Sequence, residues 1–146
     1  MASVEKSVLV PFGAPTMYEL VNHVEMYPEF LPWCGGAQTL TREGSMTTAR
    51  IDIDYRGVKQ SFVTRNRLQE GVSLHMELVS GPFESLAGDW TFHALSETAC
   101  KVEFRLDYAF SSRVLEKLVG PVFDYIAATL VDSFVLRAEA IHSRSL

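Results

Sequence analysis

The chain has 146 residues, of which 47% are hydrophobic and 21% are charged, and its formal net charge is −5. This length predicts a single domain, residues 1–146, whose core needs neither disulfides nor a structural metal. The acidic balance argues against broad nucleic-acid binding and excludes DNA as an expected partner, because such binding depends on clustered Lys and Arg. Cys34 and Cys100 fit no metal-ligand spacing and are predicted to be small core residues.

The first elements predicted along the chain are a strand and a helix. Apolar and polar residues alternate from Val4 to Val10, which predicts a strand that Pro11 ends. Residues 14–24 carry one apolar stripe at helical spacing, which predicts a helix. Two prolines between residues 27 and 34 limit that segment to a short helix and a turn, and a strand is expected at about 37–43.

The next two predicted strands form a hairpin around a two-residue turn, Arg56-Gly57. This turn would pair Tyr55 with Val58, Ile53 with Gln60 and Ile51 with Phe62 on the inner face. The same register pairs Asp54 with Lys59 and Thr48 with Arg65 on the outer face. The hydrophobic and the charge patterns therefore favour one register.

The second half predicts three more strands and a helical end. Alternation continues at about 72–78, 86–95 and 101–108, with turns at 69–71 and 81–82. Beyond residue 110 the pattern is helical. Gly120-Pro121 is expected to split or kink it, with a short helix at about 112–119 and a long one at about 121–142.

The strands outnumber what one helix can cover. Strands lie ~4.8 Å apart and a helix is ~10 Å across, so a helix shields about two strands. The sheet must then curl around the long helix, and the class is α+β. An apolar cavity is expected between sheet and helix. Its predicted lining consists of the inward strand positions and the apolar arc of the helix: Ile51, Ile53, Tyr55, Gln60, Phe62, Thr64, Met76, Leu78, Trp90, Phe104, Leu106, Phe123, Ile126 and Leu130.

Two features of this interior have alternative explanations. Gln60, Thr64 and Asn66 share the inner face, where they either meet water near the end of the sheet or hydrogen-bond the polar atoms of a ligand. The cavity mouth is expected at three aromatic residues, which are either gates or plugs of the core: Phe30, Trp33 and Phe83.

Catalytic and metal-binding patterns are absent from the sequence. There is no Gly-x-Ser-x-Gly turn, no glycine-rich phosphate loop and no metal-ligand spacing. Residues 118–136 resemble a membrane span. However, Asp124 and Asp132 cost roughly 5–7 kcal/mol near the centre, against roughly 3–6 kcal/mol gained from the apolar residues. We therefore expect a core helix, and a protein that is not an enzyme.

A set of motifs along the chain resembles those of a known family. The segments are Val10-Pro11, Met17-Tyr18, 20–22, 27–34, 64–66, 81–83 with Leu86, Gly88, Trp90 and Phe92, and 100–110. Over residues from Val4 to Arg144 they resemble the coenzyme Q-binding START-like family, which is also described as polyketide cyclase/dehydrase-like. The blocks at 27–34 and 81–92 are the specific ones, whereas the long helix is generic.

The resemblance implies a helix-grip fold, in which a curved seven-stranded antiparallel sheet surrounds a long C-terminal helix. It implies ubiquinone or a related polyprenyl lipid as ligand, with no further cofactor required. The first expected function is a quinone carrier or chaperone that supports respiratory electron transport. It would work in the cytoplasm, at times at the surface of the inner membrane.

The alternative implied by the resemblance is a ribosome association toxin that binds the large ribosomal subunit and blocks subunit association. Its basic patch would have to come from the outer face of the sheet, at Lys59, Arg65, Arg67 and Arg105. Polyketide cyclase/dehydrase-like chemistry is the enzymatic alternative.

Overall fold

The computed structural model describes residues 1–142. The predicted domain and the family resemblance both end within residues 143–146, which lie outside the described part. The elements, in chain order, are β1 (Ala2–Val10), α1 (Ala14–Asn22), the 3-10 helix η1 (Val24–Glu29), β2 (Cys34–Glu43), β3 (Met46–Tyr55), β4 (Val58–Gln69), β5 (Ser73–Ser80), β6 (Phe83–Ser96), β7 (Ala99–Phe110) and α2 (Arg113–His142).

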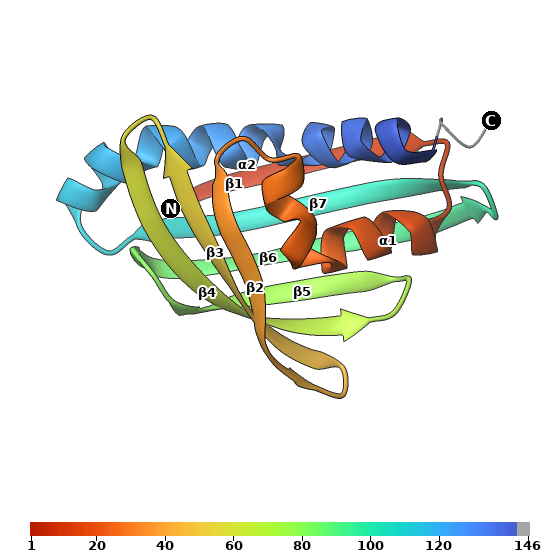
Figure 1. Cartoon of the computed structure of the whole chain (residues 1–146), viewed down its shortest axis with the longest axis horizontal. Helices are drawn as coiled ribbons and strands as arrows, with labels where there is room; N and C mark the ends of the chain where they lie inside the picture. The colour runs from red at the N-terminus through yellow and green to blue at the C-terminus, as the bar shows by residue number, and fades with distance from the viewer. Residues whose placement is uncertain (143–146) are drawn as a thin grey trace.

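The strands form one seven-stranded sheet in the order β1-β7-β6-β5-β4-β3-β2. Every neighbouring pair is antiparallel. Figure 1 shows the sheet curling, so that β2, β3 and β4 cross the direction of β6 and β7, while α2 runs along one side. The α+β helix-grip fold is confirmed.

The predicted register of the β3–β4 hairpin is confirmed at every pair. Tyr55 faces Val58, and the other predicted partners follow in step on both faces. Arg56 (φ 49°) and Gly57 (φ 81°) both adopt left-handed backbone angles, as a type I′ turn requires. Such a turn matches the twist of the flanking strands, which fixes which side chains of β3 and β4 point inward.

The expected division of the C-terminal helix at Pro121 is wrong. α2 is one helix from Arg113 to His142 with Pro121 inside it. Proline removes one backbone hydrogen bond at this position, but the preceding turn is held by packing. Val119 and Gly120 are buried, and a Cβ on Gly120 would lie 3.7 Å from the ring of Phe110.

α2 is the central helix of the core. By length and composition alone it would suffice to cross a membrane, but its apolar arc is buried against the sheet. Tyr108 of β7 donates a hydrogen bond to the carboxylate of Asp124, which ties helix to sheet. Burial, and then this bond, raise the pKa of Tyr108.

α1 and η1 close the other side of the interior. Met17, Tyr18 and Val21 of α1 are buried, and Tyr27 of η1 packs on Phe134 of α2 with ring centroids 5.4 Å apart. The hydroxyl of Tyr27 donates to the carbonyl of Val21, which joins the two helices. Both cysteines are buried, as the sequence predicts.

Candidate functional site

A cavity of about 80 Å³ lies between the concave face of the sheet and α2. It is built by α1, η1, the segment before β2, strands β3 to β7 and the middle of α2. Its lining consists of Val21, Val24, Tyr27, Trp33, Ala49, Ile51, Phe62, Thr64, Asn66, Leu74, Met76, Leu86, Trp90, Phe104, Leu106, Phe123, Ile126, Ala127 and Leu130. Nearly all of these side chains are apolar, so the cavity suits a hydrophobic molecule.

One buried polar pair interrupts this apolar lining. Thr64 and Asn66 are two residues apart on β4, so they share the inner face, and both are buried. The Thr64 hydroxyl donates to the Asn66 side-chain oxygen at 2.9 Å. The side-chain amide of Asn66 carries an oxygen and a nitrogen, and only one of them bonds to Thr64, whichever way the amide is turned. Within residues 1–142 the other atom makes no hydrogen bond, and it is accessible to water, since no buried side-chain nitrogen or oxygen there lacks a partner.

This pair is the polar feature of an otherwise apolar lining. No buried side-chain nitrogen or oxygen among residues 1–142 lacks a hydrogen-bond partner, so the second polar atom of Asn66 is accessible. It can pair with water or with a polar atom of a bound molecule. The other hydroxyl in the lining, that of Tyr27, is already engaged with Val21, and burial raises its pKa, so it stays neutral.

Most of the residues predicted to line the cavity are brought together by the structure. The lining includes Ile51, Phe62, Thr64, Met76, Trp90, Phe104, Leu106, Phe123, Ile126 and Leu130. Whether these side chains touch a ligand stays a prediction. Their common position follows from the confirmed register and from the helical arc of α2.

Four other predicted lining residues lie outside the cavity. Ile53 and Gln60 pair with each other one step nearer the hairpin turn than Ile51 and Phe62, and they border a shallow outer hollow. Tyr55 lies next to the turn and stacks on Tyr125 of α2, with centroids 5.8 Å apart. Alternation assigns these residues to the inner face correctly, but it does not say where the cavity ends.

The fourth residue, Leu78, is half-buried near the end of β5 and packs against the core without lining the cavity. It faces Thr64 across the β4–β5 pair, where a register shift interrupts the ladder. The interruption changes the path of β5 at this point, and the sequence pattern carries no signal for it.

The three residues expected at the cavity mouth have different environments. Trp33 is buried and belongs to the lining itself. Phe83 is the first residue of β6, where its ring packs 4.8 Å from that of Phe123, outside the lining. Phe30 packs on Phe134 at 5.2 Å, and the guanidinium of Arg137 lies 5.2 Å from its ring centroid.

Several lining residues did not come from the sequence argument. They are Val21, Val24, Tyr27, Ala49, Leu74, Leu86 and Ala127, with Asn66 considered only as a polar residue of the inner face. The apolar stripe of residues 14–24 predicts burial of Val21 and Val24, but nothing in it indicates that α1 borders the cavity. Only the packing of α1 and η1 against α2 brings them there.

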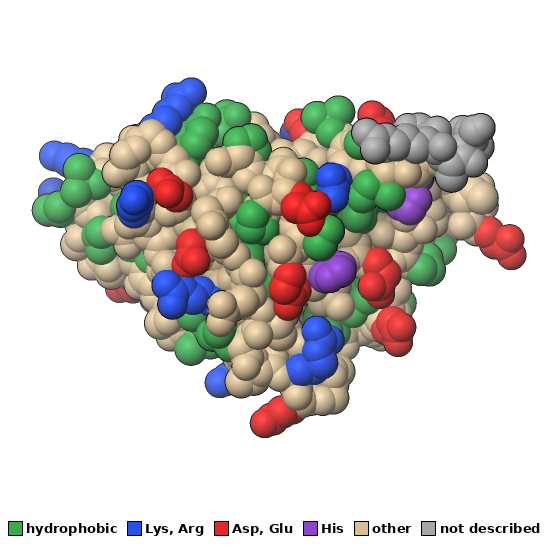
Figure 2. All heavy atoms as spheres, in the orientation of Figure 1, with side chains coloured by type: hydrophobic (Ala, Val, Ile, Leu, Met, Phe, Trp, Pro, Cys, Tyr) green, Lys and Arg blue, Asp and Glu red, His purple; other side chains and the backbone are tan. Residues whose placement is uncertain are grey.

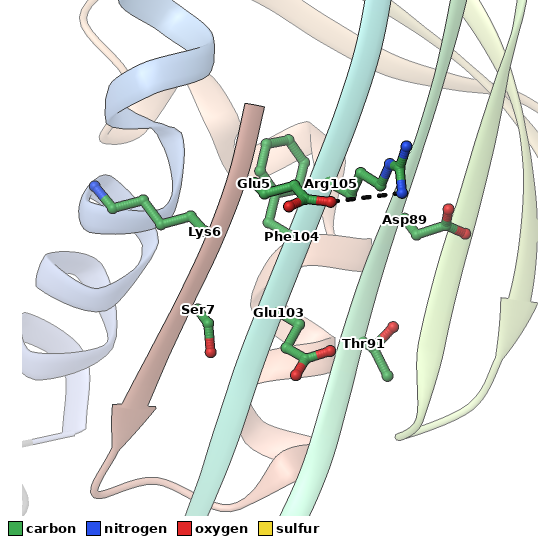
Figure 3. Close-up of a pocket in the computed structure, with 8 residues that line it drawn as sticks. All are labelled: Glu5, Lys6, Ser7, Asp89, Thr91, Glu103, Phe104 and Arg105. Carbon is green, nitrogen blue, oxygen red and sulfur yellow. Dashed lines mark ion pairs between the residues drawn. The ribbon is translucent and has the colours of Figure 1, made fainter. Parts of the chain in front are cut away.

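The convex face of the sheet carries a larger but charged hollow of about 540 Å³. Figure 3 shows Glu5, Asp89 and Glu103 around it, with Lys6 turned away toward α2. Lys6 pairs with Asp132 at 3.0 Å. The carboxylates outnumber the one cation that remains, Arg105, so this hollow suits neither an apolar molecule nor a phosphate.

The outer-face cations proposed for ribosome binding lie among acidic side chains. Arg105 pairs with Glu5 at 3.5 Å and with Asp107 at 3.3 Å. Arg65 lies opposite Glu77 in the sheet register, and Lys59 lies opposite Asp54. Arg67 lies opposite His75, which is itself bound by two carboxylates.

Chemistry based on a nucleophile or a metal finds few groups to support it. Among residues 1–142 no cluster of three or more His, Cys, Asp or Glu side chains could hold a metal ion. Burial raises the pKa of Cys34 to about 11, so its thiol is protonated at neutral pH. The arrangement can bind an apolar molecule and offer it one hydrogen bond.

Comparison with known proteins agrees with this architecture. Residues 10–135 match the family described as polyketide cyclase/dehydrase and lipid transport. The chain is 41% identical over 143 residues to a protein named ribosome association toxin RatA of Escherichia coli K12, covering 98% of this chain and 90% of that protein.

A more distant relative carries a different name. The chain is 24% identical over 143 residues to a mitochondrial coenzyme Q-binding protein, COQ10 homolog B of Xenopus laevis, covering 95% of this chain and 59% of that protein. The solved Zhui aromatase/cyclase of Streptomyces sp. R1128 superposes with a TM-score of 0.82 at 15% identity, covering 94% of this chain and 93% of that chain. This last likeness establishes the fold alone. The chain belongs to the polyketide cyclase/dehydrase and lipid transport family, and its resemblance to the coenzyme Q-binding START-like proteins is confirmed.

Proposed function

We propose that the cavity binds a hydrophobic molecule that carries oxygen, with ubiquinone or a related polyprenyl lipid as the first candidate. The observation that supports this most strongly is the buried Thr64–Asn66 pair in an otherwise apolar lining. A quinone offers carbonyl oxygens for Asn66 and an apolar ring and tail for the remaining side chains.

The cavity is too small to take up the proposed ligand unless the side chains around it move. Its volume of about 80 Å³ equals that of a few water molecules at ~30 Å³ each. A quinone ring with a prenyl tail is several times larger. Half-buried lining residues must therefore move, and these are Tyr27, Phe62, Met76 and Leu130.

The role that follows is that of a carrier. A polyprenyl quinone is nearly insoluble in water, so it needs an apolar enclosure whenever it leaves a bilayer. We place this activity in the cytoplasm beside the inner membrane, in support of respiratory electron transport. The distant relative named as a coenzyme Q-binding protein supports this choice of ligand.

The experiment is organic extraction of the purified full chain, followed by mass spectrometry of the extract. The proposal predicts a quinone or polyprenyl lipid at close to one molecule per chain. An extract without lipid, together with no binding of short-chain ubiquinone added afterwards, would contradict it. A matched extraction of an unrelated protein from the same cells measures lipid carried over nonspecifically.

A second candidate function is association with the large ribosomal subunit. The 41% identity to proteins named ribosome association toxin favours it. Binding to ribosomal RNA through Arg65 and Arg67 should weaken steeply with salt, because each phosphate contact releases counterions. Ligand burial in the cavity should change little over the same range.

Co-sedimentation with large ribosomal subunits across a salt series separates the two candidates. The carrier proposal predicts little binding at physiological salt, given the acidic chain and the mixed charges of the outer face. Strong binding that the Arg65→Glu, Arg67→Glu double variant abolishes would favour the second candidate.

A further inference from the structure

The first half of α2 exposes an apolar stripe to solvent. Val114 and Leu118 are each 65% exposed, and Tyr125 is 49% exposed. Pro121 is also exposed. In chain order Val114, Leu118, Pro121 and Tyr125 lie at positions i, i+4, i+7 and i+11, which places them on one side of the helix. We call these four residues the α2 stripe. Further along the same side the charged Asp132 interrupts the apolar row, and the exposed Leu136 follows it.

Cationic side chains flank the α2 stripe. Arg113 and Lys117 lie along one edge, on the same helix, and both are exposed. Near Tyr125, the Arg56 guanidinium lies 5.1 Å from the ring centroid of Tyr55, which in turn stacks on Tyr125. Figure 2 shows Lys or Arg and hydrophobic side chains at this end of the molecule, with some acidic side chains beside them, whereas more of the acidic side chains and the histidines lie toward the other end.

The acidic groups of this part of α2 do not cancel these cations. Glu116 lies on the opposite side of the helix from the α2 stripe, beside Glu84 and the N-terminal residues. Asp124 lies on the Lys117 edge and keeps its negative charge, although its carboxylate accepts a hydrogen bond from Tyr108. Three cations, Arg113, Lys117 and Arg56, flank the stripe against this one carboxylate, so its edges keep a local positive balance in a chain whose net charge is −5.

We propose that the α2 stripe is a docking surface for an anionic lipid bilayer. An exposed row of Val, Leu, Pro and Tyr can enter the boundary between headgroups and acyl chains, while flanking Lys and Arg contact anionic headgroups. The buried arc of α2 stays within the fold, so the helix lies on the membrane and does not cross it.

The chemistry of the stripe favours lipid over RNA. RNA would satisfy Arg113 and Lys117, but it offers no apolar phase for Val114 and Leu118. Helix α2 also connects this surface to the cavity. Phe123 and Ile126 line the cavity from the same two turns that carry Pro121 and Tyr125 on the outside. Docking would bring the cavity to the membrane surface, although the docking itself requires no ligand.

The test is flotation of the full chain with vesicles that contain no quinone. One set is phosphatidylcholine alone, and the other is phosphatidylcholine mixed with anionic phosphatidylglycerol. Wild type should bind the anionic vesicles and bind the neutral ones far more weakly. Replacing Val114 and Leu118 by Ser should weaken binding about tenfold or more, because two apolar side chains lose their burial. Lys117→Gln should weaken it about fivefold.

Leu95→Ser is the matched control, because Leu95 is also an exposed leucine (59%) but lies on β6, away from α2. It should float like wild type, and thermal unfolding of each variant checks its folding. Equal losses in the Leu95 control, equal binding to both vesicle types, or no binding by wild type would overturn the proposal. A further result would also overturn it. Wild type would not float with vesicles, and the double Val114→Ser, Leu118→Ser variant would lose co-sedimentation with large ribosomal subunits.

Discussion

The two halves of the sheet pack differently against α2. On β7 the inner residues Cys100, Val102 and Phe104 are exposed by 2% or less. On β4 and β5, the inner residues Phe62 and Met76 are only half-buried, although they face the same interior. The alternation that the sequence shows is equally regular in both halves. Regular alternation therefore predicts which face is inner, but not how tightly that face is packed.

The reason is geometric. One helix of ~10 Å diameter covers about two strands spaced ~4.8 Å apart. α2 packs closely on the β7 side, and the Tyr108–Asp124 hydrogen bond holds it there. The curl of β3 and β4 then leaves a gap that α1 and η1 fill only in part, and the cavity is what remains. The loosely packed half is thus where a ligand can enter at the smallest cost in packing.

Truncation of one phenylalanine in each half of the sheet is the strongest test of this difference in packing. Phe104→Ala should lower the free energy of unfolding by about 3–5 kcal/mol, because a fully buried ring is lost. Phe62→Ala should lower it by about 1–2 kcal/mol, since its ring is already half-exposed. Urea unfolding of both variants measures the difference, and equal losses would show that the two halves are packed alike.

A cavity-filling substitution tests the loosely packed half directly. Ile126→Trp places a larger side chain in the lining and should weaken binding of short-chain ubiquinone more than tenfold, a loss of ~1.4 kcal/mol or more. Ala128→Trp adds the same side chain at an exposed position of α2 and is the control. Co-elution of quinone with protein in gel filtration reports binding. Retained binding in the Ile126 variant would remove that residue from the ligand site.

The polar pair can be separated from the apolar lining by a choice of ligands. Asn66→Leu should weaken ubiquinone binding about tenfold, the value of one buried hydrogen bond. It should leave the binding of a polyprenyl hydrocarbon that lacks oxygen unchanged or slightly stronger. Equal losses for the two ligands would indicate that Asn66 shapes the cavity and does not recognise oxygen.

The smallest expected effect lies on the charged outer face, on the opposite side of the sheet from the cavity. Hydrogen bonds with Glu77 and then Asp89 raise the pKa of His75 above its ordinary value of about 6.5. A raised folded-state pKa gives stability that is full below the unfolded-state pKa and is lost as the pH rises through the folded-state pKa. Because the His75 side chain is 35% exposed, the contribution should stay below about 1 kcal/mol.

His75→Gln should therefore flatten the dependence of the unfolding free energy on pH above about 6.5. Urea titrations at a series of pH values compare the variant with wild type. Parallel curves for the two proteins would show that the pair of carboxylates contributes no net stabilisation to the charged imidazole.

The sequence predicts the strands and the hairpin register well because both depend on local patterns. Arg56-Gly57 specifies its turn, and the pairs from Tyr55 to Thr48 follow from it. The position of an inner-face residue relative to the cavity does not follow from these local patterns. Ile53 and Gln60 carry the same inner-face pattern as Ile51 and Phe62, yet they lie beyond the cavity.

Long-range packing explains the other differences. The effect of Pro121 on α2 depends on what buries the turn before it, which the local sequence does not state. The contribution of Val21, Val24 and Tyr27 to the lining depends on how α1 and η1 pack on α2. These contacts join residues that are distant in the chain, and no periodicity within one element encodes them.

Intrinsic fluorescence offers the most direct test of a ligand site in this cavity. The chain contains two tryptophans, and both of them, Trp33 and Trp90, line the cavity. A quinone bound there would lie close to both indoles and quench them. We predict that short-chain ubiquinone quenches the fluorescence along a saturable curve that fits one site per chain. Quenching that rises linearly with quinone concentration, as it does for free tryptophan, would contradict a quinone site between the sheet and α2.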